Sequence, residues 1–588
     1  MGTGTNTRAE TLIVENGLFF DGRGGKPAVR HLRIRDGRVE KISATRFPHE
    51  EGARVIDARG KWVMPGFIDV HTHYDAEVEL EPSLGESLRH GVTTVFLGSC
   101  SLSVAVGDPD DLTDQFTRVE AIPEAYLRPL IREKKTWETV SEYVEHLDGL
   151  PLGPNVTTFV GYSAVRSHVL GLERSLDPKE KPSGRELARM KAIVNEGLDA
   201  GCVGLSTNTL YWDKMGGDRF RSRCLPSTYA SWGELSEMVE LVRARDLVYQ
   251  TIPNVSTKYE IVYLAAFSAG LGRRAPLKTS VVSIMDLRSN RLIYKALQRI
   301  GRFINGPLRG NFRFQALPVP FDLYADGFDI VVFEEFGAGA AALHVNDAIE
   351  RRNLFRDSKY RAWFRRQWRN PFIPKVFHRN FGMAEIKECP DARLVGRTFE
   401  QVARERGQDV VDTFFDLVVE HGEKLRWYTV VGNDRFAPLA SILDHDTITI
   451  GFSDAGAHLR NMAFYNFPLR MLKFVRDAER AGRPVMPIER AVHRLTGELG
   501  EWYGIDAGTL REGGRADVVI VDPERLDHEL ERMHEAKMEG FGDRPRLVRR
   551  NPAAVPAVIV NGRLAVENGE PLPEVGRTRG YGRFLRAL

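Results

Sequence analysis

The chain has 588 residues, of which 42% are apolar and 28% charged. This composition is ordinary for a globular protein, and the length predicts a large core domain with a second, smaller domain. The net charge of +2 gives no electrostatic reason to expect nucleic acid or a membrane surface as the main partner.

Cysteine usage and the first residues bear on the compartment. Four cysteines in so long a chain do not predict a disulfide framework, so a reducing cytoplasm is expected. The start, "MGTGTNTRAETLIVENG", lacks the apolar stretch of a signal peptide. No apolar run of about 18 residues predicts a membrane span either.

Both ends of the chain carry short apolar runs broken by Asn-Gly and Asp-Gly pairs. This pattern is typical of β-hairpins. Because neither end has enough apolar residues to fold separately, we expect residues 1–63 and 505–570 to meet in one small β-sandwich. Residues 571–588 would then form a C-terminal tail.

Residues 64–504 alternate strand-like apolar runs with amphipathic helical segments, which is the pattern of parallel βα units. Eight such runs predict an α/β fold, the TIM (β/α)8 barrel, with its site at the carboxyl ends of the strands. The predicted strands lie, in chain order, in residues 66–73, 91–100, 155–166, 202–211, 247–254, 276–286, 425–434 and 447–458.

The interval between the sixth and seventh predicted strands, residues 287–424, is far longer than an ordinary connection. Long insertions of this kind are usually functional, which predicts a lid. The insertion contains the basic and aromatic segment "RRNLFRDSKYRAWFRRQWRNPF". We expect a solvated helix face with tryptophans packed beneath it. A lid for acidic substrates and a contact within a homo-oligomer are the alternatives.

The segment "PGFIDVHTHYD" places His71 and His73 at the end of the first predicted strand. Alternate side chains of a strand share a face, so the two imidazoles point the same way at the active end of the barrel. Two converging imidazoles suit a divalent metal ion. Two unrelated polar residues in a loop are the alternative.

Two other strand ends add candidates for this site. Cys100 ends the second strand, where a thiolate could bind zinc, with a buried structural cysteine as the alternative. Asp454 ends the eighth strand, which lies beside the first in a closed barrel. Its carboxylate could bind the metal and accept a proton from water, with a helix N-cap as the alternative. The sequence has no G-x-S-x-G elbow, P-loop or Rossmann motif.

Three residues near these strand ends are candidate substrate ligands. His458 and Arg460 follow Asp454 on its loop, and an arginine can hold a carboxylate through two hydrogen bonds. Tyr211 ends the fourth predicted strand and could orient a substrate oxygen. A surface arginine and a packed rim tyrosine are the alternatives.

Six segments together resemble the amidohydrolase superfamily, and within it the N-acyl-D-amino-acid deacylases (D-aminoacylases): "VMPGFIDVHTHYD", "GVTTVFLGSCSLS", "FTRVEAIPEA", "NVTTFVGYSAVR", "GLSTNTLY" and "GRADVVIVDP". The resemblance covers most of the chain and is weakest in residues 287–424. It implies a β-sandwich plus a TIM barrel and hydrolysis of an N-acyl bond, with Asp454 as acid/base and Arg460 holding a substrate carboxylate. It also implies a zinc site built from His71, His73, Cys100 and Asp454.

The chain departs from the pattern of that family at three strands. The family has a histidine at the end of strand five, where this chain has Gln250, and histidines at strand six, where it has Ser280. The "VGHS" of the third strand is "VGYS" here, with Tyr162. Since two usual imidazole ligands are missing, we expect one zinc ion, or two if other residues replace those ligands.

Four residues are candidates for such a replacement. Lys278, in the sixth strand, could be carbamylated and bridge two metals, with a core or substrate-binding lysine as the alternative. Glu335 and His344 lie in the apolar segment "FEEFGAGAAALH", where a buried acid requires a partner. His378 is another imidazole of the insertion. A structural role is the alternative for each histidine.

The residues and the resemblance together predict a hydrolase of carbon–nitrogen bonds other than peptide bonds. Its substrate would be a small N-acylated amino acid, attacked by metal-activated water while Asp454 moves the proton. The alternatives are a cyclic-amide hydrolase or a deaminase of the same superfamily, and a barrel protein that binds a ligand without hydrolysing it.

Overall fold

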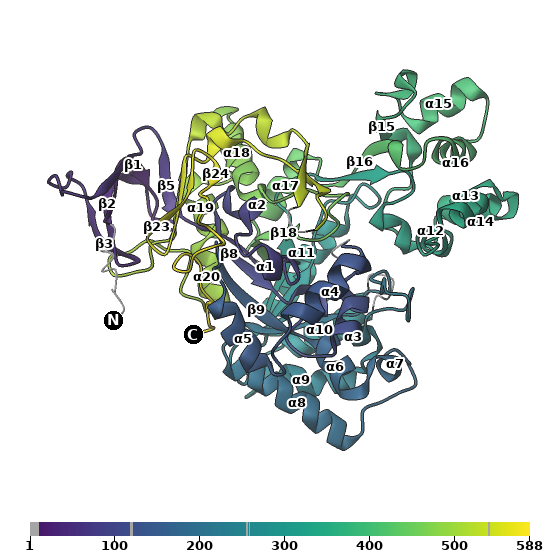
Figure 1. Ribbon diagram of the computed structural model, residues 1–588, viewed down its shortest axis with the longest axis horizontal. Coiled ribbons are helices and arrows are strands. Elements are labelled where there is room, and N and C mark those ends of the chain that lie inside the picture. Colours follow the sequence, from purple (N-terminus) through teal and green to yellow (C-terminus); the bar gives the residue numbers. More distant parts are fainter. Residues whose placement is uncertain (1–10, 118–121, 255–256, 258, 539–540) are drawn as a thin grey trace.

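The structure is a computed structural model that describes every residue except 1–10, 118–121, 255–256, 258 and 539–540. Residues 118–121, which belong to the "RVEAIPEA" segment, therefore lie outside the described residues. Figure 1 shows a central barrel, a β-rich domain beside it that both chain ends enter, and a helical module that projects from the opposite side.

Eight parallel strand positions form the barrel, which confirms the predicted TIM-barrel fold. The ring closes where β18 pairs with β7 and the Val70 amide donates to the Gly451 carbonyl at 2.7 Å. The strands are β6 (Phe67–Asp69) continued by β7 (His71–Thr72), β8 (Val92–Leu97), β9 (Asn155–Gly161), β10 (Gly204–Asn208), β11 (Val248–Ile252), β12 (Lys278–Val282), β13 (Asn311–Ala316), and β17 (Ile448–Ile450) continued by β18 (Phe452–Ala455).

The seventh barrel strand is β13, so the expectation for residues 425–434 was wrong. β13 pairs with β12 on one side and β17 on the other. Residues 425–434 do form a strand, but it belongs to a separate sheet of the insertion. The insertion therefore lies between strands seven and eight, and residues 293–305 form an ordinary barrel helix, not part of a lid.

Helices lie around the barrel strands (Figure 1). Among the described residues, no helix is both long and apolar enough to cross a membrane. These helices are α1 (Glu77–Leu80), α2 (Gly85–Leu88), η1 (Ser99–Ser101), α3 (Pro109–Phe116), α4 (Glu124–Lys134), α5 (Val140–Gly149), α6 (Tyr162–Leu170), α7 (Leu172–Ser175), α8 (Gly184–Asp199), η2 (Pro226–Tyr229), α9 (Trp232–Arg243), α10 (Glu260–Ser268), α11 (Ile293–Asn305), α17 (Phe436–Leu443), α18 (Phe467–Arg480), α19 (Ile488–Leu495) and α20 (Gly497–Tyr503).

Both chain ends build one nine-stranded sheet. Leu32 and Ile559, near opposite edges of the strand order, share one apolar core, so the sheet curls around itself as a small sandwich. The exact limits of this domain, 1–63 with 505–570, stay a prediction. Its strands are β1 (Leu12–Phe19), β2 (Ala28–Arg35), β3 (Arg38–Ser43), β4 (Arg54–Asp57), β5 (Trp62–Pro65), β19 (Val518–Val521), β22 (Ala557–Val560), β23 (Arg563–Glu567) and β24 (Glu570–Pro571).

The rest of the C-terminal segment returns to the barrel. The hairpin of β20 (His534–Met538) and β21 (Arg544–Val548) contacts the loop after β18 through the Leu547 amide and the Leu459 carbonyl, 2.9 Å apart. The last residues run beneath the barrel, where Leu585 packs with apolar side chains of the strands. The short helices of this segment are η7 (Pro523–Arg525), η8 (His528–Glu531) and η9 (Pro552–Ala554).

The insertion module, residues 321–432, combines a three-stranded antiparallel sheet with several helices. Its core is rich in aromatic rings, with Phe333 and Phe364 centred 5.8 Å apart. Its elements are β14 (Phe321–Asp326), η3 (Val331–Glu335), α12 (Gly337–Leu343), α13 (Ala348–Arg356), α14 (Ser358–Arg369), η4 (Phe381–Met383), β15 (Ala384–Glu388), η5 (Ala392–Leu394), α15 (Phe399–Arg406), α16 (Val410–His421), η6 (Gly422–Lys424) and β16 (Arg426–Gly432).

Helix α14 carries the basic and aromatic segment singled out in the sequence. Its Tyr360, Phe364 and Trp368 are buried, because their spacing of four residues places them on one face. Arginines on the neighbouring turns pair with aspartates of α16, as Arg361 does with Asp416 at 2.8 Å. The aromatic residues are therefore core, and the arginines hold two helices together.

Candidate metal centre

The four residues predicted to form the metal site lie together at the carboxyl end of the barrel strands. His71 is in β7, and His73 follows it on the same face of the chain. Cys100 and Asp454 lie in η1 and β18, both with left-handed backbone, at φ 54° and 60°. A non-glycine residue in this conformation costs free energy, and such residues cluster at functional sites.

The donor atoms of these residues converge. His71 Nε2 lies 3.1 Å from Cys100 Sγ, and His73 Nε2 lies 3.5 Å from the same sulfur. Asp454 Oδ1 is 3.2 Å from His73 Nε2 and 3.7 Å from His71 Nε2. The donor atoms around a tetrahedral zinc ion are separated by about 3.3–3.6 Å, given its bond lengths. The observed separations of 3.1–3.7 Å lie close to this range, so small shifts of the side chains would let them bind one zinc ion.

Gln315, at the end of β13, orients His71 from behind. Its Oε1 lies 2.9 Å from His71 Nδ1, and its Nε2 donates to Ser280 Oγ at 2.9 Å. Because an amide oxygen only accepts, Nδ1 of His71 carries the proton and Nε2 presents its lone pair to the other donors. The hydroxyl of Tyr503 lies 3.3 Å from Ser280 Oγ and extends this chain toward the floor of the barrel.

Asp69 joins the first and eighth strands beneath the site. Its carboxylate accepts from the His71 amide at 3.3 Å, from the Ser453 amide at 3.3 Å and from the Ser453 hydroxyl. Burial raises the pKa of Asp69 to about 8, although these hydrogen bonds oppose the shift. The carboxyl group of Asp69 therefore holds Ser453, the neighbour of Asp454, against the strand that carries His71.

Burial and the charge of Asp454 together set the pKa values of the donor side chains. Burial lowers the pKa of His71 to about 4, so this imidazole is neutral at pH 7. Burial also lowers the pKa of His73, but the hydrogen bond and charge of Asp454 outweigh it and raise that pKa overall. Burial raises the pKa of the Cys100 thiol well above its usual value. A cation would favour the thiolate and the neutral imidazoles that metal binding requires.

The positions that lack the histidines of the family hold neutral polar side chains. Gln250 Oε1 accepts the Cys100 amide at 3.2 Å, and among the described residues its buried Nε2 has no hydrogen-bond partner. Ser280 bonds Gln315, as described above. Tyr162 is buried and donates to Glu234 at 2.7 Å, which makes it part of the protein core.

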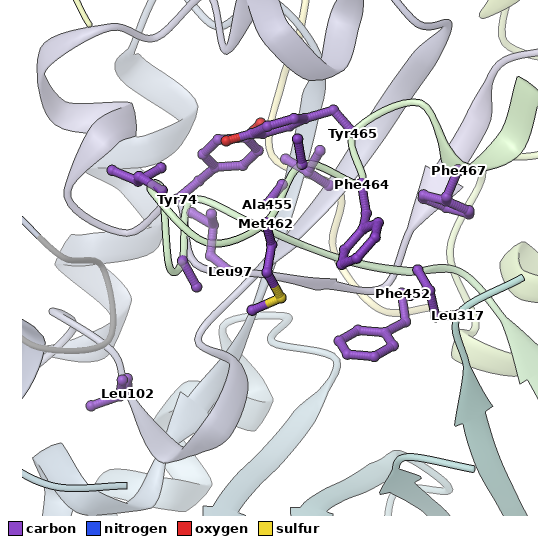
Figure 2. Packing of buried hydrophobic residues seen from close by; sticks show 14 of the residues in the cluster. Tyr74, Leu97, Leu102, Leu317, Phe452, Ala455, Met462, Phe464, Tyr465 and Phe467 are labelled. Atoms are coloured by element: carbon purple, nitrogen blue, oxygen red, sulfur yellow. The ribbon is translucent and has the colours of Figure 1, made fainter. Parts of the chain in front are cut away.

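Apolar side chains surround the donors. Phe452, in β18, packs edge-on against the His71 ring with centroids 5.0 Å apart. Figure 2 shows Phe452, Met462 and Phe464 along the chain from β18 to α18, together with Tyr74 just after the His-Thr-His segment. All four side chains are buried, and Phe452 covers one side of the His71 ring.

The predicted substrate ligands lie on the rim. Tyr211 is 51% exposed, on the loop after β10. Burial opposes the lowering of the pKa of Asp454; His73 and His71 lower that pKa, and the charge of His458 adds a smaller contribution in the same direction. His458 and Arg460 also line a pocket of about 700 Å³ beside the β20–β21 hairpin. Their substrate-binding roles remain predictions.

Arg460 already has two carboxylate partners in this structure. Its guanidinium lies 2.8 Å from both Asp326 of the insertion module and Glu535 of the hairpin. Arg426 of β16 bonds the same two acids. This four-charge cluster links the loop after β18 to the insertion module and the C-terminal hairpin, so Arg460 has a structural role whatever it does for substrate.

Lys278 does not lie near the metal centre, so the carbamylated bridge was wrong. It is the first residue of β12, at the amino end of the barrel, and pairs with Asp246 at 2.8 Å. Parallel strands place their first and last residues at opposite ends of a barrel. The sequence segment was identified correctly as strand six, but Lys278 begins that strand, whereas the four metal-site residues lie in or just after the carboxyl ends of theirs.

The acid and the two histidines of the insertion also lie away from the metal centre. Glu335 is buried against Arg379 at 2.8 Å and accepts the Val376 amide. His344 lies 3.3 Å from Glu334, and His378 bonds Thr429 at 2.9 Å. Each has a partner within the module, so the structure does not bring them into the site.

Gln315 and Asp213 also lie near the site and were not predicted from the sequence. Gln315 lies in the strand that was overlooked; the signal was the alternation of "NFRFQA" between "RG" and "LPVP". Asp213, on the loop after β10, raises the pKa of both His73 and Cys100 through its charge, so it is electrostatically close to the donors. No sequence pattern pointed to Asp213.

Comparisons with known proteins agree with this geometry. The model of the amidohydrolase family matches residues 54–212. An uncharacterized protein of Mycobacterium tuberculosis is 46% identical over 583 residues, which are 98% of this chain and 95% of that protein. An N-acyl-D-aspartate deacylase of Alcaligenes xylosoxydans xylosoxydans is 31% identical over 206 residues, 34% of this chain and 37% of the relative.

A solved structure supports the fold over the whole length. N-acyl-D-glutamate deacylase from Bordetella bronchiseptica, complexed with zinc and a phosphonate inhibitor, aligns over 99% of this chain and 100% of its own, with a TM-score of 0.62 and 20% identity. The chain described here belongs to the amidohydrolase superfamily, has the fold of the D-aminoacylases, and is by class a hydrolase of carbon–nitrogen bonds other than peptide bonds.

Proposed function

We propose that this chain is a metal-dependent amidohydrolase that cleaves the amide bond of a small N-acylated amino acid. The observation that carries the proposal is the convergence of His71, His73, Cys100 and Asp454 at distances typical of zinc ligands. The relatives named N-acyl-D-aspartate and N-acyl-D-glutamate deacylase support the substrate class.

His71, His73 and Cys100 would hold one metal ion, because these three donors lie within 4.8 Å of one another. Three protein ligands and an open fourth position are typical of catalytic zinc. When bound, such an ion supplies Lewis-acid chemistry: it polarises a carbonyl oxygen and lowers the pKa of water.

Asp454 would act as the acid/base. Its Oδ1 lies beside both imidazoles, and His73 and His71 keep its pKa below the usual range against the opposing effect of burial. The carboxylate is therefore ionised at neutral pH, as a proton acceptor must be. It would accept a proton from water and then deliver that proton to the leaving nitrogen, as amide cleavage requires.

The test is elemental analysis of the purified wild type and of a His71→Ala/His73→Ala variant. We expect about one zinc ion per chain in the wild type, as for a three-ligand catalytic site, and none in the variant. A His344→Ala/His378→Ala variant is the matched control, since it removes two histidines of the insertion module and should keep the metal. A wild type that takes up no metal after refilling with zinc would overturn the proposal.

The metal-loaded protein would then be assayed with N-acetyl-D- and N-acetyl-L-amino acids, by measuring release of the free amine. Turnover of one series supports the deacylase and sets its chirality. Metal binding without turnover of either series would leave cyclic-amide opening, deamination or ligand binding without hydrolysis as the function.

We also propose a cytoplasmic location, supported by four cysteines that are all free. A homo-oligomer remains a prediction. Fractionation of the producing cells and light scattering on the purified protein test these two points.

A further inference from the structure

A pocket of about 800 Å³ lies outside the metal centre, and its lining includes none of the four metal-site residues. Its walls come from the β14–β16 sheet of the insertion module, the loop of residues 318–320, and helices α17 and α18. We call it the Arg470 pocket. Its volume is in the range of small-molecule sites.

Helix α18 turns one face toward this pocket. Arg470, Lys473, Phe474, Asp477, Ala478 and Ala481 all line it. Their spacing of three and four residues places them along one stripe of the helix. The arginine that begins this stripe therefore points at a cavity and not at the apolar core.

Arg470 is 8% exposed, yet no hydrogen bond or ion pair of its guanidinium occurs among the described residues. Its Nη1 is fully buried without an acceptor. Burial lowers the pKa of Arg470 to about 10, and the nearby charge of Arg549 acts in the same direction. A buried charge without a partner is costly, so proteins rarely keep one without a use for it.

Arg549, also buried in the wall of this pocket, differs from Arg470 in having bonded partners. Arg549 pairs with Asp322 and donates to the Ala463 carbonyl at 3.0 Å. Two guanidinium groups thus share a wall with one buried carboxylate, which is already bonded to Arg549. Arg470 feels the charges of Asp322 and Glu531, but among the described residues its buried Nη1 has no hydrogen-bond acceptor, so it can bind an acceptor that enters the pocket.

The rest of the lining combines basic side chains and aromatic rings with the carboxylates of Asp434, Asp477 and Glu531. Lys473 is 3.3 Å from both Asp477 and Glu531, on the wall next to Arg470. Tyr324 and Tyr428 have ring centroids 5.0 Å apart, and Arg483 lies over the Phe436 ring at 4.5 Å. A guanidinium fork binds carboxylates and phosphates through paired hydrogen bonds, while the rings suit a flat apolar group.

We propose that the Arg470 pocket binds a small organic anion, with its carboxylate or phosphate on Arg470 and its apolar body against Tyr428 and Phe436. This site is separate from the metal centre and does not depend on the proposed hydrolysis. It gives the protein a second small-molecule site at the junction between the barrel and the insertion module.

The test is isothermal titration with sodium phosphate, acetate and benzoate, using the His71→Ala/His73→Ala protein so that no anion can bind a metal there. We expect saturable binding, with benzoate tighter than acetate if the rings contact the ligand. The difference in affinity between phosphate and acetate shows whether Arg470 prefers a phosphate or a carboxylate group. Arg470→Met should weaken binding about tenfold or more, as expected for a lost charge-assisted pair.

Arg480→Met is the matched control, because Arg480 lies on the same helix but is exposed and paired with Glu524 at 2.7 Å. It removes the same charge and should bind like the parent. If Arg470→Met does not fold, Arg470→Lys and Lys473→Met replace it, and each should weaken binding. The proposal is overturned by no saturable binding of any probe, or by pocket variants that bind as the parent does.

Discussion

The metal centre and the insertion module bury the same types of residue in different arrangements. At the barrel rim, two imidazoles, a thiol and a carboxylate turn their donor atoms toward one another. In the insertion module, Glu335 bonds Arg379 and His378 bonds Thr429, each group with its own partner. Convergence on one point, more than residue type or burial, therefore distinguishes a candidate metal site from a structural cluster.

The largest expected effect comes from Asp454→Asn. The amide keeps the size and an oxygen donor but cannot accept the proton, so turnover should fall by about 10³-fold or more. Metal content should remain close to that of the wild type. Activity assay and elemental analysis of the same sample check this; full activity in the variant would remove the acid/base role.

Glu335→Gln tests whether the buried acid of the insertion module has a structural role and no role in catalysis. It leaves Arg379 charged and buried with a neutral partner, so the free energy of unfolding should fall by about 3 kcal/mol. The kcat of the remaining folded protein should not change. Glu385→Gln is the control: its pair with Lys387, at 2.7 Å, is partly exposed, and its loss should cost about 0.5 kcal/mol. Denaturant unfolding measures both, and a lower kcat in Glu335→Gln would place that residue in the site.

Gln315→Leu removes the hydrogen-bond acceptor of His71 Nδ1 and puts an apolar side chain of similar size in its place. Partners of this kind typically contribute 10- to 100-fold to metal affinity, so we expect zinc to bind about 10-fold more weakly. Gln315→Glu retains an acceptor and should recover most of the affinity. Competition with a chelator measures the change, and unaltered affinity in Gln315→Leu would show that Gln315 does not position His71.

Arg460→Ala and Arg426→Ala share a test, because both arginines bond Asp326 and Glu535. Each loss should lower the unfolding midpoint. Only Arg460→Ala should raise KM, and more for substrates with a free carboxylate than for their amides. An equal rise for both kinds of substrate would remove the carboxylate-binding role and leave the structural one.

The last prediction concerns His378, whose effect appears only as the pH is lowered. Burial lowers its pKa to about 4, and its Nδ1 accepts the Asn380 amide at 3.0 Å, which favours the neutral ring. The unfolded chain, with an ordinary pKa near 6.5, binds a proton first. Stability from this group is therefore present above about pH 6.5 and is lost as pH falls toward 4. The stability gap between wild type and His378→Gln should narrow by about 2 kcal/mol between pH 7 and 5; a constant gap would contradict this.

Much of the fold and the core of the site followed from local patterns. The His-Thr-His strand end, Cys100 and Asp454 could be placed at one rim because parallel strands end together. The seventh barrel strand could not be identified in this way. The segment "RWYTVVG" is indeed a strand, but only tertiary pairing decides that it joins the sheet of the insertion module. Because β13 was not predicted as a barrel strand, Gln315 was not recognised as a site residue. The partners of Lys278 and Arg460 could not be predicted because they come from chain segments far apart in sequence.

Residues 582–588 seal the end of the barrel farthest from the metal site. The Arg583 carbonyl accepts the Val156 amide at 3.0 Å, and the Ala587 amide donates to Gly201 at 2.9 Å. A barrel whose first strand begins at Phe67 thus waits for residues made much later on the ribosome. The floor of the barrel is therefore expected to close only after residues 582–588 have been synthesised, and until then its strands lack part of their packing partners.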